Sequence, residues 1–146
     1  MAQLGAMEFH LGRVIDHVHL ITKDLAASRR FFDAVLGALG RQRTMEGEHF
    51  FAYDEFFVSD TEFPGVGKTT TTRLHLAFQA ADRNAVGRAY QAGLAAGGRD
   101  HGGPGERPYH PGYYAAFLLD PDDNNIEAVY HGPAKRSAAS VVITAG

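Results

Sequence analysis

An internal repeat constrains the fold of this chain more than any other feature of its sequence. Residues 17–40 align without a gap on residues 75–98, and eight of the 24 aligned pairs are identical, His17 and His75 among them. Average composition would give roughly one or two identities over this length. The chain is therefore predicted to contain two copies of one supersecondary unit.

Each copy is predicted to begin with a short strand and to continue into a helix. The strands are expected over residues 14–22 and 74–78, which are rich in apolar and β-branched side chains. Asp24 and Asp82 take the position of helix N-caps, where a carboxylate accepts hydrogen bonds from the first free amides of the helix. Apolar residues at helical spacing follow, and glycines end both helices.

Further strand-like runs follow each helix. They cover residues 49–53, 55–59, 113–119 and 126–130. A strand, a helix and further strands, repeated twice, predict an α+β fold of two βαβββ modules with curved mixed sheets.

The repeat also sets the expected domain limits. One domain is predicted over residues 12–132, with module one at 12–60 and module two at 69–132. The segment 99–112 is rich in glycine and proline and is predicted to be a long loop without secondary structure, and such loops often bind or cover ligands. The tails, 1–11 and 133–146, match the repeat nowhere and are expected to be flexible.

Composition argues against several classes of partner. The formal net charge is −3 without a long run of one sign, so nucleic acid and anionic membranes are poor partners. No apolar stretch reaches the roughly 18 residues of a membrane span. The first residues do not resemble a signal peptide, so a cytoplasmic location is expected. The absence of cysteine excludes thiolate ligands and thiol catalysis.

Two matched histidines and one glutamate form a candidate metal site. Duplication places matched positions around a pseudo-two-fold axis, so His17 and His75 are expected near the centres of their strands, facing one another across a cavity. Histidine is the commonest metal ligand. Glu127 stands among apolar residues in the last predicted strand, where a buried carboxylate needs a partner such as a cation. The alternatives are histidines that only pack or hydrogen-bond, and an ion pair between Glu127 and an arginine.

These residues lie in motifs that resemble the vicinal oxygen chelate superfamily, which includes glyoxalase I, extradiol dioxygenases and the fosfomycin- and bleomycin-resistance proteins. The motifs are Ile15-Asp-His-Val-His-Leu20, Asp24-Leu-Ala-Ala-Ser28, Phe31-Phe32, His75-Leu-Ala-Phe78, Phe117-Leu-Leu-Asp-Pro-Asp122 and Asn125-Ile-Glu127. The resemblance extends over residues 12–132 and implies that the two modules enclose a cavity.

The resemblance assigns His17, His75 and Glu127 to the metal-ligand positions of the superfamily. It implies one divalent cation, Fe, Zn, Ni or Mn, with open coordination positions for two neighbouring oxygens of a small-molecule substrate. The cation would act as a Lewis acid. The resemblance also implies a homodimer, and in some relatives both subunits contribute to the site.

Departures from the relatives leave the reaction open. Glyoxalase I carries a further carboxylate ligand where this chain has Phe56 and Phe57, and extradiol dioxygenases and fosfomycin-resistance enzymes carry a tyrosine where it has Phe117. Bleomycin-binding relatives generally lack the metal triad. The predicted function is a metal-dependent lyase, isomerase or dioxygenase acting on a small oxygenated molecule. The alternative is a protein that binds or sequesters a small molecule, with a vacant or structural metal site.

Residues 107–114 resemble a loop of a glyoxalase-like bacterial subgroup and supply most of the candidate substrate contacts. His19 joins them because it shares a strand face with His17. The full set is His19, Arg107, Tyr109, His110, Tyr113, Tyr114 and Phe117. For the aromatic members, packing against the sheet is the alternative. His131 is expected at the surface.

Overall fold

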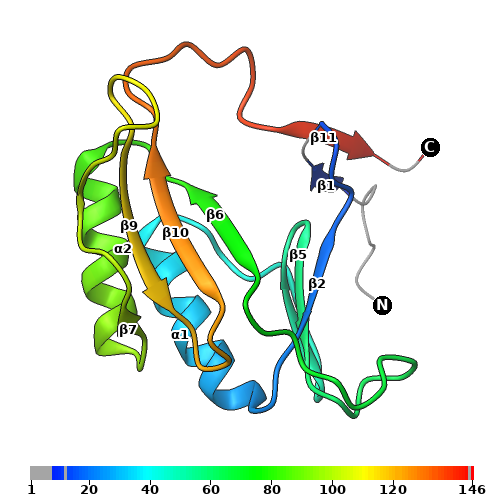
Figure 1. Cartoon of the computed structure of the whole chain (residues 1–146). Coiled ribbons are helices and arrows are strands. Elements are labelled where there is room, and N and C mark those ends of the chain that lie inside the picture. The colour runs from blue at the N-terminus through cyan, green and yellow to red at the C-terminus, as the bar shows by residue number, and fades with distance from the viewer. Residues whose placement is uncertain (1–7, 12, 145) are drawn as a thin grey trace.

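The computed structural model describes residues 8–11, 13–144 and 146, and within residues 8–11 only the backbone. The described part of the chain forms a four-stranded and a five-stranded sheet with two helices, and a two-stranded sheet lies apart from them (Figure 1), so the α+β fold predicted from the sequence is confirmed. In the part of the chain that is described, no helix is long and apolar enough to cross a membrane.

Module one is a four-stranded sheet with one helix. Its elements are β2 (Val18–Ile21), α1 (Leu25–Ala38), β3 (Met45–Glu46), β4 (Phe50–Tyr53) and β5 (Phe56–Ser59). The strand order is β2-β5-β4-β3, in which β2 runs parallel to β5 and the other neighbours are antiparallel.

Module two repeats this plan. Its elements are β6 (His75–Gln79), α2 (Arg83–Ala95), β7 (Arg99–Asp100), β8 (Gly105–Glu106), β9 (Tyr114–Leu119) and β10 (Asn125–Tyr130). The order is β6-β10-β9-β7, with β8 also paired to β9, and β6 runs parallel to β10 as β2 does to β5. The matching topology confirms that the sequence repeat is a structural repeat.

The helix boundaries agree with the sequence. The Asp24 side chain accepts a hydrogen bond from the amide of Ala27 at 3.1 Å, and Asp82 accepts one from Ala85 at 2.7 Å. Gly40, just after α1, has a φ of 83°, a conformation that costs glycine less than any other residue.

Several local expectations were wrong. His17 lies one residue before β2 and His75 is the first residue of β6, whereas both were predicted near strand centres. The segment 99–112 is not free of secondary structure, because β7 and β8 pair with the edge of β9. No strand was expected in the tails, but within their described residues β1 (Glu8–Leu11) and β11 (Val141–Thr144) pair antiparallel.

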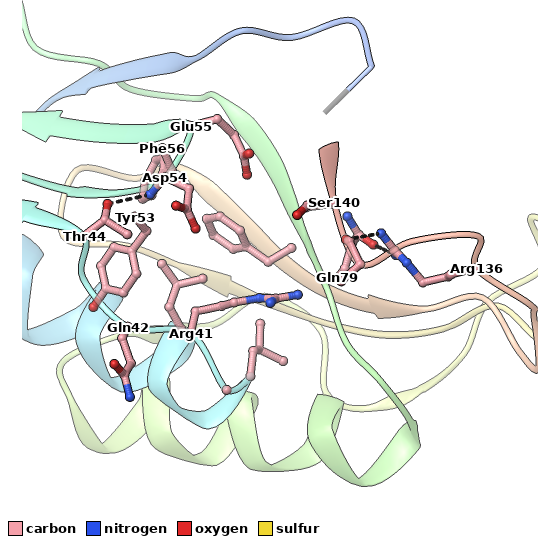
Figure 2. A pocket seen from close by; sticks show the side chains of 16 residues that line it. Arg41, Gln42, Thr44, Tyr53, Asp54, Glu55, Phe56, Gln79, Arg136 and Ser140 are labelled. Atoms are coloured by element: carbon pink, nitrogen blue, oxygen red, sulfur yellow. Dashed lines mark hydrogen bonds between the residues drawn. The ribbon is translucent and has the colours of Figure 1, made fainter. Parts of the chain in front are cut away.

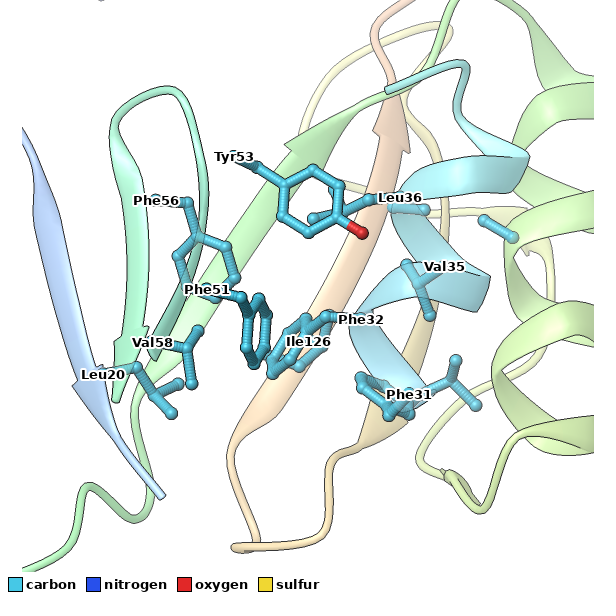
Figure 3. Close-up of a cluster of buried hydrophobic side chains, with 13 residues drawn as sticks. Leu20, Phe31, Phe32, Val35, Leu36, Phe51, Tyr53, Phe56, Val58 and Ile126 are labelled. Atoms are coloured by element: carbon cyan, nitrogen blue, oxygen red, sulfur yellow. The ribbon is translucent and has the colours of Figure 1, made fainter. Parts of the chain in front are cut away.

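One hydrophobic core serves both modules, and α1 lies at its centre. Phe31, Phe32 and Val35 on α1 are at most 1% exposed. They belong to one cluster that takes side chains from both sheets, including Leu20 and Val58 in module one and Leu118, Ile126 and Ala128 in module two (Figure 3). Because both sheets turn one face to this shared core, their other faces point outward.

The turn between β9 and β10, in which Asp120 and Asn124 are buried, joins the modules. Asn124 is fully buried, and its side chain bonds to the backbone of Leu74 and Thr71 at 3.0 Å each. Asp122 accepts a hydrogen bond from the amide of Lys23 at 3.1 Å and another from the Thr22 hydroxyl. The turn therefore fixes the start of β6 and the end of β2 relative to β10.

Candidate metal-binding site

The Glu127 carboxylate is the centre of the candidate site. Its neighbours Ile126 and Ala128 belong to the core, so alternation along β10 turns Glu127 to the outer face of the sheet. Even there it is only 1% exposed. A carboxylate at this depth requires partners for both oxygens.

His75 and Tyr113 provide those partners. Nε2 of His75 donates to Oε1 of Glu127 at 2.8 Å, and the hydroxyl of Tyr113 donates to Oε2. The contact with His75 follows from strand pairing, because β6 and β10 are neighbours and His75 lies opposite Asn125, two residues from Glu127. The His75 ring remains 55% exposed. One face of this carboxylate–imidazole pair is thus open to solvent.

Tyr113 stays a proton donor over the whole physiological range. Partial burial, assisted by the hydrogen bond to Glu127, raises the pKa of Tyr113 to about 12. Because the protonated phenol of Tyr113 occupies Oε2, Oε1 is the carboxylate oxygen that can exchange its hydrogen bond with His75 for another partner.

A histidine pair supports Tyr113 from the loop side. The rings of His110 and His131 stack with centroids 5.1 Å apart, and both meet the Tyr113 ring edge-on, at 5.3 and 5.0 Å. Nδ1 of His110 donates to the carbonyl of Pro111 at 2.9 Å, and Nε2 of His110 shares a hydrogen bond with Nδ1 of His131, 2.8 Å away. His131 is exposed as expected, but its part in this cluster was missed because its partner comes from a distant loop.

Phe117 lies beside His75, and Arg107 lies against Phe117, so the site has an apolar ring and a positive charge at this side. Phe117 lies opposite Glu127 in the β9–β10 ladder, and its ring centroid is 6.0 Å from that of His75. The Arg107 guanidinium lies 5.3 Å from the Phe117 centroid and donates to the carbonyl of Gly103 at 2.6 Å. The structure therefore brings both residues to the outer face that carries Glu127.

The two other tyrosines of the loop differ in position. Tyr109 is 68% exposed, and its ring centroid lies 4.9 Å from that of Tyr113 at the margin of the cluster. Tyr114 starts β9 and stacks under the guanidinium of Arg83, the first residue of α2, at 4.6 Å. The structure thus places Tyr114 against a helix and away from Glu127.

His17 and His19 lie on the outer face of module one. The His17 ring is 63% exposed, and its Nδ1 pairs with Asp16 at 2.7 Å. His19 bonds to the Ser59 hydroxyl at 2.7 Å and meets Phe57 edge-on. Partial burial and the charge of His17 lower the pKa of His19.

The predicted triad does not assemble within one chain. Among the residues described, no group of three His, Cys, Asp or Glu side chains could hold a metal ion. The reason is the shared core: both sheets pack inward on α1, so the face with His17 and the face with Glu127 do not turn toward one another. Within one chain, the structure brings together one imidazole, that of His75, and one carboxylate, that of Glu127. These two groups are part of the ligand set that a cation needs.

The paired βαβββ modules define a fold of the vicinal oxygen chelate type. The chain belongs to the Glyoxalase/Bleomycin resistance protein/Dioxygenase superfamily, whose family model matches residues 14–128. No curated protein matches the chain.

Solved structures agree with this assignment. A glyoxalase/bleomycin resistance protein from Albidiferax ferrireducens T118 is 30% identical, with a TM-score of 0.66 over 80% of this chain and 98% of that one. A glyoxalase-related enzyme from Fulvimarina pelagi is 21% identical, with a TM-score of 0.67 over 93% and 100%. A lactoylglutathione lyase from Agrobacterium tumefaciens shares the fold at 18% identity, with a TM-score of 0.56 over 80% and 92%.

Proposed function

We propose that this protein is a divalent-metal-dependent enzyme of the glyoxalase/dioxygenase type that acts on a small oxygenated molecule. The observation that carries the proposal is the buried Glu127 carboxylate held 2.8 Å from the exposed His75 ring. A cation with ligand distances near 2.0–2.1 Å can take both groups when it replaces the proton they share. Membership of the superfamily supports this reading.

The third ligand in this proposal is His17 from a second copy of the chain. His17 is exposed and lies on a different outer face from Glu127, so a two-fold dimer can bring one copy's His17 to the other copy's pair. The proposed enzyme is therefore a homodimer with two sites, each built from both subunits.

A bound cation would supply Lewis-acid chemistry for a substrate that chelates it. The residues of the chain have separate tasks in the proposal. Tyr113 orients the carboxylate, and the His110–His131 pair holds the loop that carries Tyr113. Phe117 offers an apolar wall to the substrate, and Arg107 provides a positive charge that favours an anionic or oxygen-rich one.

Mixed dimers test this arrangement directly. Chains carrying His17→Ala and chains carrying His75→Ala are produced with different tags, and the mixed dimer is purified by both. A dimer with shared sites then contains one intact site and binds one Zn(II) tightly, as measured by elemental analysis and calorimetry. If all three ligands came from one chain, the mixed dimer would contain no intact site and would bind no Zn(II) tightly.

A matched control and an activity screen complete the test. His101→Ala removes another exposed histidine and should leave two tight sites per dimer. The wild-type protein loaded with Fe(II), Ni(II), Zn(II) or Mn(II) is screened on dicarbonyl–thiol adducts and on catechols. Turnover that is lost in both single variants and regained in the mixed dimer supports the enzyme, whereas a strictly monomeric protein contradicts the shared site.

A binding protein is the second candidate, and one observation favours it. A single chain supplies only two of the three expected ligands. If the protein sequesters a small molecule, its affinity for that molecule should persist after chelation of metals and in His75→Ala.

A further inference from the structure

A cleft of about 540 Å³ lies between the two modules, apart from the candidate metal site. The end of α1, the turn between β4 and β5, strand β6 and residues 136–140 surround it (Figure 2). Neither His17, His75 nor Glu127 lines it. Its volume falls within the roughly 300–1,000 Å³ that small-molecule sites occupy.

The floor of the cleft is apolar. Leu36 and Phe56 are only 3% and 4% exposed, and they connect the cleft to the core. The ring of Phe78 on β6 meets Phe56 edge-on with centroids 5.3 Å apart. An apolar group of a ligand would therefore lie against aromatic and aliphatic side chains.

Opposite charges border this floor. The Arg41 side chain extends across the cleft below the carboxylate of Asp54, as Figure 2 shows. Within the described part of the chain, no hydrogen bond or ion pair is formed by the guanidinium of Arg41 or by the carboxylate of Asp54. The cleft thus presents a cation and an anion that are not committed to each other, beside Glu55 and Arg136, each of which has an interaction of its own.

The C-terminal segment closes the far side. Arg136 donates to the side chain of Gln79 and, at 2.9 Å, to the carbonyl of Ala139. These contacts hold residues 136–140 against β6, and they use the donors of Arg136 on the protein itself. Arg41 is therefore the cation with donors to offer a ligand.

We propose that this cleft binds a small zwitterion with an apolar body, a hydrophobic α-amino acid. The carboxylate of the ligand pairs with Arg41 and its ammonium group with Asp54, while its side chain packs on Phe56 and Phe78. A zwitterion satisfies both charges, whereas a simple anion or a simple cation leaves one charge of the cleft opposed or unpaired.

The test uses the full-length protein and three related probes in isothermal titration calorimetry. L-Phenylalanine carries both charges, 3-phenylpropionate lacks the ammonium group and 2-phenylethylamine lacks the carboxylate. L-Phenylalanine should bind saturably, one per chain, and each analogue about tenfold or more weakly. Arg41→Gln and Asp54→Asn should each weaken L-phenylalanine by about tenfold or more, since a charged hydrogen bond is lost.

Two control variants show whether binding depends on this cleft alone. Arg30→Gln removes an exposed arginine from α1 outside the cleft and should leave binding unchanged. His75→Ala should also leave it unchanged, so failure of the proposed metal function would not affect the result. No saturable binding of L-phenylalanine, or equal affinity in Arg41→Gln, would overturn the proposal. So would cross-linking that places a second copy of the chain in the cleft.

Discussion

Tyr113 and Glu127 are joined by a hydrogen bond from the phenol to Oε2, which links the long loop of module two to its central strand. Oε1 of the same carboxylate is held by His75. The buried carboxylate is therefore fixed from two sides before any ligand arrives.

Loss of the Tyr113 hydroxyl should destabilise the fold. Tyr113→Phe leaves Oε2 of a buried carboxylate without its donor, so the free energy of unfolding should fall by about 1–3 kcal/mol. Urea unfolding monitored by circular dichroism measures the change. Tyr109→Phe is the matched control, because Tyr109 is 68% exposed, and its effect should stay within about 0.5 kcal/mol. Equal effects of the two substitutions would contradict the assigned role of Tyr113.

Two glycines of α2 should respond in opposite directions to alanine. A Cβ at Gly93 would collide with the Leu118 side chain and lie 2.9 Å from Val35, so Gly93→Ala should destabilise the fold by about 1–3 kcal/mol. Gly87 has no atom within 4 Å of such a Cβ. Gly87→Ala should therefore stabilise the helix by about 0.5–1 kcal/mol. Thermal unfolding of both variants checks the packing of α2, and a stabilising Gly93→Ala would refute it.

The turn between β9 and β10 should be among the least tolerant parts of the chain. Asn124→Ala leaves the amide of Leu74 and the carbonyl of Thr71 without their side-chain partner, so a loss of about 3 kcal/mol or more is expected. Asp123→Asn is the control, since Asp123 has a φ of 66° that asparagine also adopts and its pair with Arg99 is exposed. Denaturant unfolding should separate the two variants clearly, and similar midpoints would argue against the turn as a link between modules.

The pair of His49 and Asp60 gives the fold a pH dependence. The hydrogen bond to Asp60 raises the pKa of His49 above its usual value near 6.5. Partial burial of Asp60 raises its pKa, but hydrogen bonds from His49 and from the amide of Glu62 outweigh this effect and lower the pKa of Asp60. The stabilisation of the fold that His49 contributes is present below pH 6.5 and is lost as the pH rises through the raised pKa of His49. The stabilisation that Asp60 contributes is lost as the pH falls through the lowered pKa of Asp60.

Proton NMR titration measures the His49 pKa directly. Asp60→Asn should lower it toward 6.5, because the hydrogen-bonded charge is gone. Glu48→Gln should have a much smaller effect, since Glu48 lies 3.9 Å away and is 89% exposed. Equal shifts in both variants would contradict the assigned pairing.

The sequence repeat predicted the fold well because the features within each copy, such as the helix caps, depend on residues that are close together in the chain. Asp24 and Asp82 cap their helices as expected, and the matched strands occupy matched places in the two sheets. The candidate site was predicted only in part. His75 and Glu127 meet because neighbouring strands carry them, whereas His17 lies just before the first strand of the other sheet.

The remaining differences have long-range causes. The orientation of the two sheets depends on how Phe31 and Val35 pack against module two, which no periodicity reveals. His131 joins the site through a loop residue 21 positions away. Strand β11 pairs with β1 in the register Glu8–Thr144, across more than 130 residues of chain. The sequence of one tail therefore does not indicate that it pairs with the other.

The pairing of β1 with β11 has a practical consequence for engineering. Strands β1 and β11 lie side by side (Figure 1), and residues 8 and 144 are opposite one another in their antiparallel register, so a short linker could join these two residues and new ends could be opened between module one and module two. Such a rearranged chain would carry module two ahead of module one, while each strand kept its neighbours.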